Sequence, residues 1–342
     1  MDERNVIDGH LERIRETAAD IGRDITLMEI CGGHTNVIMR YGIRDILPKN
    51  IRLISGPGCP VCVTSQRDID CMIELAMSGI PVATYGDMMR VPGSRRSLED
   101  AKAGGGTVYE VYSTTEVVEL GKKHPGIVFF GVGFETTAPM TAYLLENGVC
   151  AYSAHKLIPP ALAALSAGEV KVDGFIDPGH VSTIIGVRPY RAVKVPQVIS
   201  GFTPERILRG IMLLVGLIRD GKDIVVNGYP EAVKEEGNRK AQRLLDRHFY
   251  KADCDWRGLG TIPKSGLEVR DDTLNAKILH KKLLEKVPAP KKSGCRCAEI
   301  LKGLIEPTQC PLYKKTCTPE NPRGACMVSG EGSCAIYHRY GK

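Results

Sequence analysis

The sequence is poor in aromatic residues and has no long apolar stretch, and both absences exclude classes of protein. Only 6% of its 342 residues are Phe, Trp or Tyr. Lys and Arg occur in no run longer than a pair, so the net charge of +6 is spread out and indicates no nucleic-acid surface. The most hydrophobic stretch, 207–218, is interrupted by Arg209 and is well short of the ~20 residues that cross a bilayer, so we expect a soluble protein.

Two further absences concern phosphate binding and export. The glycine run at 104–106 lacks the Gly-Lys-Ser/Thr sequence of a P-loop. The N-terminal residues 1–5 are charged and lack the apolar core of a signal peptide, so we expect a cytoplasmic protein. Twelve cysteines are more than packing requires in that reducing compartment, and they indicate metal or redox chemistry.

Apolar runs that alternate with helical patterns predict an α/β protein with mainly parallel sheets. In the first third of the chain, we expect strands at 25–30, 51–55, 80–85 and 107–112, and helices at 3–19, 65–78 and 114–123. From His124 onward, the sequence predicts a second unit that is a diverged repeat of the first. Three of its strand ends match earlier ones in order: 133–139 matches 31–35, 174–180 matches 53–59, and 195–202 matches 81–87.

The chain therefore predicts two similar Rossmann-like α/β domains, at 1–123 and 124–230, with a third unit at 231–342. A helix at 204–219 and a strand at 223–227 close the second domain. The third unit is expected to begin with a charged helix at 231–249 and a loop-rich segment through Trp256. Two facing α/β units make a cleft between the carboxyl ends of their strands, and we expect the site there.

Cys59 and Cys62 form a C-x-x-C motif between an apolar strand and a helix-like segment. The helix N-terminus favours thiolate over thiol, and Pro60 stiffens the turn between the two cysteines, so we interpret the pair as a reversible dithiol. The alternative is half of a zinc site. No second C-x-x-C is present, but Cys31 and Cys71 could supply further ligands.

Cys31 ends the first buried strand, and Gly-Gly and His34 follow it. In a purely structural interpretation, Cys31 packs as a small hydrophobic residue and His34 is a residue of the first helical turn. Because two glycines leave room for a group to approach the sulfur, and a second strand end with thiols follows, we favour a functional role. Glu135, His155 and His180 would line the same cleft from the other domain, although a cap or surface role is as plausible for each alone.

The last 48 residues are rich in cysteine and proline and have few apolar residues for a core. Small loop-rich modules of this kind need disulfides or a bound metal for stability. In a cytoplasmic protein the irregular spacing favours an iron–sulfur cluster over zinc knuckles or disulfides, and four thiolates would ligate it. The cysteines of this segment are Cys295, Cys297, Cys310, Cys317, Cys326 and Cys334.

Four motifs in order resemble the HypD family of hydrogenase maturation proteins over nearly the whole chain. They are Cys-Gly-Gly-His-Thr at 31–35, Gly-Pro-Gly-Cys-Pro-Val-Cys at 56–62, Gly-Phe-Glu-Thr-Thr-Ala-Pro at 133–139, and the cysteine tail at 310–334. The resemblance implies a scaffold that acts with the small partner HypC. On it the Fe(CN)2CO unit of [NiFe]-hydrogenase would be assembled, with cyanide arriving from HypE and the hydrogenase large subunit reached through HypC.

The resemblance also implies a role for each motif residue. Cys31 would bind the iron of the Fe(CN)2CO unit, with His34 beside it and a second thiolate from HypC, since soft thiolates suit this iron. Cys59 and Cys62 would exchange electrons with a [4Fe–4S] cluster, and Glu135 would act in the cleft. The cluster would be held by Cys297, Cys310, Cys317 and Cys334, which leaves Cys295 and Cys326 to pair as a disulfide.

Two other functions stay open from the sequence. An iron–sulfur thiol oxidoreductase would reduce a disulfide on a protein substrate through Cys59 and Cys62, but it would give Cys31 no task. A structural zinc protein would contain zinc and no iron–sulfur cluster.

Overall fold

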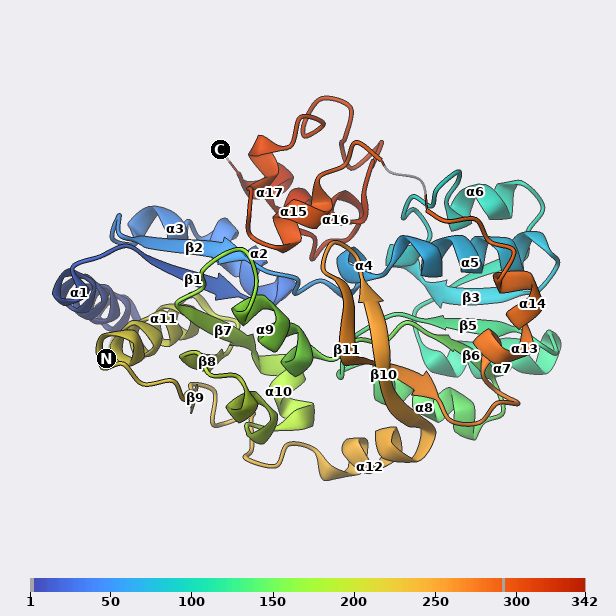
Figure 1. Cartoon of the computed structure of the whole chain (residues 1–342), viewed down its shortest axis with the longest axis horizontal. Helices are drawn as coiled ribbons and strands as arrows, with labels where there is room; N and C mark the ends of the chain where they lie inside the picture. The colour runs from blue at the N-terminus through green and yellow to red at the C-terminus, as the bar shows by residue number, and fades with distance from the viewer. Residues whose placement is uncertain (1–2, 291–292, 342) are drawn as a thin grey trace.

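The computed structural model describes residues 3–290 and 293–341 and contains two parallel β-sheets, one hairpin and a C-terminal segment (Figure 1). The five-stranded sheet has the order β2-β1-β7-β8-β9, and the four-stranded sheet has the order β4-β3-β5-β6. Every neighbouring pair in both sheets is parallel. The predicted α/β class with parallel sheets is therefore confirmed.

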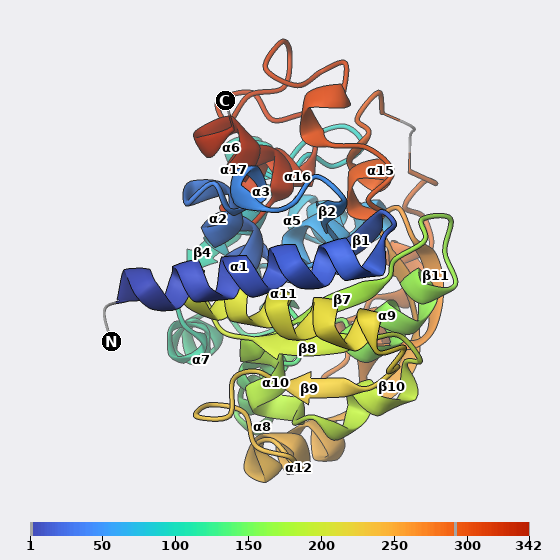
Figure 2. The same cartoon turned by 90° about the vertical axis from the view of Figure 1, so that its left-hand side faces the viewer.

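The five-stranded sheet is covered on both faces, as parallel sheets require. Helices α1 and α11 lie along one face, where Figure 2 shows them side by side. Helices α9 and α10 and the 3-10 helix η2 pack toward the other face. The strands are β1 (Ile25–Glu29), β2 (Ile51–Ser55), β7 (Gly174–Pro178), β8 (Gln197–Ser200) and β9 (Val225–Asn227). The helices are α1 (Glu3–Ile21), α2 (Gly32–Arg40), α3 (Ile43–Ile46), α9 (Ile158–Ser166), α10 (Gly179–Ile185), η2 (Arg188–Ala192) and α11 (Pro204–Arg219).

The four-stranded sheet has the same layered form. Helices α7 and α8 share an apolar cluster with one of its faces, and α5 and α6 pack on the other. The strands are β3 (Val82–Tyr85), β4 (Val108–Val111), β5 (Val128–Gly131) and β6 (Cys150–Ser153). The helices are α4 (Pro60–Val63), α5 (Gln66–Met77), η1 (Gly86–Met88), α6 (Leu98–Ala103), α7 (Thr114–Lys123) and α8 (Ala138–Glu146).

The two sheets do not divide at residue 123, where we predicted the boundary between 1–123 and 124–230. The chain forms β1 and β2, leaves to build the whole four-stranded sheet, and returns to add β7, β8 and β9 beside β1. Strands that are far apart in the sequence can be neighbours in a sheet. Here β1 is the parallel neighbour of β7, with Met28 opposite Phe175. Of the three matched pairs of strand ends, 53–59 and 174–180 lie in the same five-stranded sheet, whereas the other two pairs lie in different sheets. The matched strand ends therefore do not mark two separate copies of one domain.

A β-hairpin stands between the two sheets, where we predicted a loop-rich segment (Figure 1). It consists of β10 (Phe249–Trp256) and β11 (Gly260–Val269). The predicted helix at 231–249 is shorter than expected, because α12 (Arg239–His248) begins only after Asn238, whose side chain accepts hydrogen bonds from Lys240 and Ala241. Residues of the hairpin contact the ends of two helices: Trp256 forms an isolated β-bridge with Thr64 after α4, and the N–H of Leu157, before α9, donates to the carbonyl of Ser265 at 2.8 Å.

The C-terminal segment consists of short helices and loops above the two sheets (Figure 1). Its helix α16 packs against α4, and α17 packs against α2. The helices after the hairpin are α13 (Ala276–Leu279), α14 (Lys281–Leu284), α15 (Cys297–Leu301), η3 (Pro307–Gln309), α16 (Ala325–Val328) and α17 (Ser333–Tyr340). Across residues 3–290 and 293–341, no helix has the length and apolar character needed to cross a membrane. The cytoplasmic location stays a prediction.

The buried Trp256 joins the hairpin to the four-stranded sheet, and we expect its replacement by Phe to lower stability. Its indole Nε1–H donates to Ser265 Oγ at 2.8 Å, and its ring stacks on Phe134 at 6.1 Å between centroids. Trp256→Phe leaves the hydroxyl without this donor and opens a space, so the free energy of unfolding should fall by about 1–3 kcal/mol. Urea denaturation measures it. The matched exposed change Tyr112→Phe should alter stability by less than about 0.5 kcal/mol. Equal effects of the two changes would contradict this account.

Candidate functional site

Cys31 lies at the carboxyl end of β1, as predicted, and it occupies the N-cap position of α2 without a capping hydrogen bond from its side chain. Its backbone is extended, and its N–H donates to Glu29 Oε2 at 3.0 Å. The residue is half-buried. Burial raises the pKa of its thiol to about 12, and the nearby carboxylates of Glu331 and Glu29 raise it further, against N–H groups of the α2 N-terminus that lower it. The thiol is therefore protonated at neutral pH unless a cation takes the place of the proton.

The two glycines after Cys31 are close-packed rather than open. A Cβ on Gly32 would lie 2.6 Å from the backbone oxygen of Glu331, and one on Gly33 would lie 3.2 Å from the ring of Phe202. Our expectation that these glycines leave room for a group to approach the sulfur is thus wrong as stated. They let the C-terminal segment and Phe202 approach the start of α2.

His34 is fully buried, and its ring is held by the end of β8. The Nε2 atom lies 3.2 Å from the carbonyl oxygen of Ser200, and because a carbonyl only accepts, Nε2 carries the proton. Burial lowers the pKa of His34 to about 4, so the ring is neutral at physiological pH. Its Nδ1 has no hydrogen-bond partner within the described residues. The Phe202 ring contacts both His34, at 4.9 Å, and His180, at 3.9 Å.

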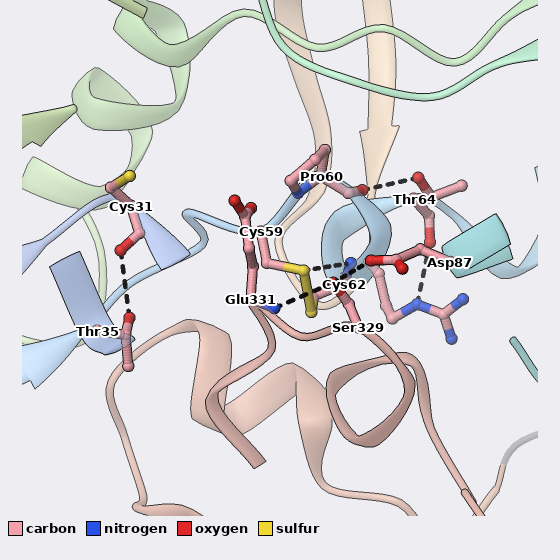
Figure 3. Close-up of a disulfide and its surroundings, with 10 residues drawn as sticks. Cys31, Thr35, Cys59, Pro60, Cys62, Thr64, Asp87, Ser329 and Glu331 are labelled. Carbon is pink, nitrogen blue, oxygen red and sulfur yellow. Dashed lines mark hydrogen bonds between the residues drawn. A yellow bond between two sulfur atoms is a disulfide. The ribbon is translucent and has the colours of Figure 1, made fainter. Parts of the chain in front are cut away.

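Cys59 and Cys62 form a disulfide at the N-terminus of α4, with their Cα atoms 5.3 Å apart (Figure 3). Cys59 is the N-cap residue, and its sulfur accepts the N–H of Cys62 at 3.2 Å. The side chains are 3% and 0% exposed, so an external disulfide cannot reach either sulfur in this conformation. The N–H of Gly32 donates to the carbonyl of Gly58 at 3.2 Å, which joins this motif to the Cys31 motif.

Three residues that we did not predict lie around the disulfide (Figure 3). Ser329 Oγ donates to Asp87 Oδ2 at 2.9 Å, and the N–H of Glu331 lies 3.3 Å from Ser329 Oγ. Burial and the charge of Asp87 raise the pKa of Glu331. Asp87 follows β3, whereas Ser329 and Glu331 belong to the C-terminal segment. No local pattern in the sequence indicates that 329–331 closes over residues near position 31.

The remaining predicted cleft residues do not all lie beside Cys31. His180 lies on the Phe202 ring beside the Cys31 motif. His155 is buried in the four-stranded unit, with its Nε2 2.7 Å from Thr141 Oγ1, and burial lowers its pKa to about 3. Glu135 lines a cavity of about 590 Å³ whose lining residues do not include Cys31. The expected single cleft lined by all these residues is therefore not formed.

Glu135 and Asp177 are buried carboxyl groups with unused oxygens. Glu135 Oε1 accepts the N–H of Ile158 at 3.0 Å, but Oε2 has no partner among the residues described. Burial raises the pKa of Glu135 to about 7. Asp177, at the end of β7, is 0% exposed, and both of its oxygens lack partners within the same residues. Burial raises its pKa well above the usual value. We did not predict Asp177, because a buried carboxyl reads in a sequence like any surface one.

The six cysteines of the C-terminal segment line one small cavity together with Tyr313 and Met327. All six are free thiols, so the expected Cys295–Cys326 disulfide is not formed in this structure. The thiol of Cys326 instead contacts Cys297 and Cys334. Within 3–290 and 293–341, no three His, Cys, Asp or Glu side chains converge to hold a single metal ion. A set of thiols spread around one cavity fits an iron–sulfur cluster, whose thiolates bind separate irons.

Comparison with known proteins adds a family to this geometry. The profile of the HypD family, described as the hydrogenase formation hypA family, matches residues 5–341. The hydrogenase expression/formation protein HupD of Azotobacter chroococcum is 42% identical over 95% of this chain and 91% of its own length. A putative hydrogenase expression/formation protein of Methanocaldococcus jannaschii is 40% identical over 99% and 98%. The hydrogenase maturation factor HypD of Azotobacter vinelandii is 42% identical over 95% and 91%.

The buried carboxyl of Glu135 should make stability depend on pH. Its pKa in the folded state is about 7, against an ordinary value of 4.5. The unfolded chain loses this proton first as the pH rises, so the folded state loses up to about 3 kcal/mol of stability between pH 4.5 and 7 and nothing further above that. Glu135→Gln keeps the acceptor for Ile158 and removes the titration. The difference in unfolding free energy between variant and wild type should grow in the variant's favour over this window. A constant difference, measured by urea denaturation across the window, would contradict the assignment.

Proposed function

Because the chain belongs to the HypD family of hydrogenase maturation factors, we propose that it is the scaffold for the Fe(CN)2CO unit, with Cys31 as the ligand of the iron. The observation that carries the proposal is the arrangement of Cys31 beside a disulfide and a cysteine-lined cavity. Gly58 joins Cys31 to the disulfide, and α16, which carries Cys326, packs against the helix of Cys62. These contacts support the proposal, because they make neighbours of the thiol that would bind the iron, the disulfide that would store two electrons and the thiols that would hold the cluster.

The surroundings of Cys31 suit an iron that arrives as cargo. A thiol with a pKa of about 12 gives up its proton only to a strong competitor, so binding of the iron would release one proton from the sulfur. A soft thiolate suits iron that carries cyanide and CO. The second thiolate would come from the N-terminal cysteine of the HypC partner, and HypE would deliver the cyanide. We propose that HypC docks at the exposed part of the region around Cys31 and passes the unit on to the hydrogenase large subunit.

His34 would act as a neutral group beside the iron. Its Nε2–H is used by the carbonyl of Ser200, so Nδ1 keeps a free lone pair that can accept a proton or a hydrogen bond. Burial keeps the pKa of the ring near 4, which means that it carries no charge that would repel a cationic iron. The charge near Cys31 comes instead from Glu29 and Glu331. For Glu135, the sequence motif at 133–139 is the only support for a role in this function, because the residue lines a cavity that does not include Cys31.

The C-terminal thiols would hold a [4Fe–4S] cluster, which supplies single electrons when it is bound. We keep Cys297, Cys310, Cys317 and Cys334 as the ligand set, with Cys326 as the thiol in contact with two of them. Two electrons and two protons convert the Cys59–Cys62 disulfide to two thiols. The burial of both sulfurs counts against the alternative in which this pair reduces a disulfide on a protein substrate. We propose three further features together with this function. The two sheets are Rossmann-like, the cluster lies in a separate domain, and the protein is cytoplasmic.

Replacement of Cys31 should separate the iron-binding role from the cluster. Cys31→Ala should abolish retention of the Fe(CN)2CO unit, seen as infrared bands of metal-bound cyanide and CO in the purified complex with HypC, while the visible absorption of the cluster persists. The matched control is Cys150→Ala, which removes another thiol, buried on β6, and should keep both signals. Loss of both signals in Cys31→Ala would mean that Cys31 serves the cluster or the fold.

Metal analysis after anaerobic purification tests the cluster itself. The wild type should contain about four iron and four sulfide per chain, and Cys310→Ala should lose them. Cys295→Ala should retain them, because Cys295 lies outside the proposed ligand set. If Cys326→Ala loses the cluster and Cys297→Ala keeps it, the ligand set changes but the cluster stands. Zinc without sulfide would overturn the cluster and the redox role of the disulfide.

A further inference from the structure

Lys156 is a buried lysine to which the proposed function gives no role. It is 1% exposed and lies on the connection between β6 and α9. Its Nζ donates to the carbonyl oxygen of Asp255 at 2.8 Å and lies 5.6 Å from the centroid of the Trp256 ring. Because a buried ammonium group costs free energy unless it has partners, these contacts fix the position of the amine inside the fold.

The sulfur of Cys254 also lies beside this amine. The Nζ atom of Lys156 is 3.1 Å from Cys254 Sγ, and the two atoms form a hydrogen bond. Burial raises the pKa of Cys254, whereas the charge and the hydrogen bond of Lys156 lower it. Cys254 is half-buried on β10, so a small dissolved molecule can reach its sulfur. The pair therefore combines a fixed amine with a thiol that is close to the surface.

The backbone holds the two residues together across one strand of the hairpin. Lys156 forms an isolated antiparallel bridge with Gly266 of β11, and β10 pairs with β11 along its other edge. Beside this bridge, the N–H of Leu157 donates to the carbonyl of Ser265 at 2.8 Å. A Cβ on Gly266 would lie 2.7 Å from Cys254 Cβ and 3.1 Å from its sulfur, so a side chain there would displace the thiol. Glycine at this position lets the thiol lie against the strand to which Lys156 is bonded.

We propose that Lys156 and Cys254 form a modification site, at which molecular oxygen links the amine nitrogen to the sulfur through one oxygen atom, as an N–O–S bridge. One N–H bond and the S–H bond break, and an N–O bond and an S–O bond form. The second oxygen atom leaves as water with the two hydrogens. Nitrogen and sulfur each lose two electrons, and the oxygen molecule takes all four. Inserted oxygen suits this pair, because the two atoms already lie at hydrogen-bond distance and need not approach to the length of a direct N–S bond.

The bridge would tie the hairpin to the chain that connects the two sheets. The hairpin stands between the sheets (Figure 1), and Lys156 lies between β6 of one sheet and α9, which packs toward the other. The two residues are 98 positions apart, so a covalent link between them restricts the unfolded chain and stabilises the folded state, as a disulfide does. The site is thus an oxidation-sensitive link that is independent of the chemistry proposed for Cys31.

Peptide mass analysis of the full chain tests the bridge directly. After exposure to air-saturated buffer, the remaining thiols are alkylated and the protein is digested with trypsin without a reductant. We expect one cross-linked product that contains Lys156 and Cys254 and whose mass exceeds the sum of its two peptides by one oxygen less two hydrogens. Trypsin should not cut after Lys156 in this product, because the enzyme recognises the free amine. A thiol reductant should release the two peptides, and protein kept under anaerobic conditions should lack the product.

The matched control is Cys254→Ser, which keeps a small polar side chain and should leave Lys156 open to trypsin after the same exposure. Exposure should also raise the urea concentration at half-unfolding of the wild type relative to this variant, and a thiol reductant should abolish the difference. Air affects any bound metal in both proteins alike, so the comparison isolates the bridge.

Three results would overturn the proposal. The first is a Cys254 that remains a free thiol after exposure. The second is oxidation confined to the sulfur of Cys254, with Lys156 still cleaved by trypsin. The third is a cross-link that has lost two hydrogens without the gain of an oxygen, which is a direct N–S bond. Each is read from the wild-type protein itself, so the test does not depend on the folding of a variant.

Discussion

The backbone contact between Gly58 and Cys31 is the constraint on which the site depends. A Cβ at residue 58 would lie 2.2 Å from the amide nitrogen of Cys31, so only glycine permits this approach. β1 and β2 are neighbours in register, from Ile25 with Ile51 to Glu29 with Ser55, and their ends leave the sheet together. The thiol that follows one strand and the disulfide that follows the other are therefore held at a fixed separation by the sheet itself.

The C-terminal segment completes this arrangement from the far end of the chain. Glu331 packs against Gly32, and Ser329 bonds to Asp87, so one short stretch contacts elements that follow β1 and β3. These contacts bring the carboxylate of Glu331 near the half-buried thiol of Cys31, where it and the buried Glu29 raise the pKa of the thiol. The sheet provides the rigid support that holds these side chains in place.

Sequence patterns identified the strand ends and the cysteine motifs but not how distant parts meet. Buried apolar runs located β1, β2, β3 and β5, because periodicity is a local property of the chain. The pairing partner of a strand can lie far away in the sequence. We therefore did not predict that the chain builds the four-stranded sheet between β2 and β7. The hairpin was missed because β10 is mostly exposed and reads as polar, Phe249 and Trp256 at its ends excepted. The glycines of the Cys31 motif were identified as special, yet their reason, close packing against Glu331 and Phe202, appears only in the fold.

The order of the strands along the chain also affects how the protein folds during translation. All four strands of the four-stranded sheet lie between residues 82 and 153, so this sheet can assemble while the ribosome is still adding the rest of the chain. The five-stranded sheet must wait, because β1 needs β7, and the bond from the N–H of Thr26 to Asp173 spans 147 residues. Until then β1 and β2 are an incomplete pair with an open edge, beside the cysteine that later ends in the site. The two strands that are translated first can thus complete their sheet only after β7, β8 and β9 have been made.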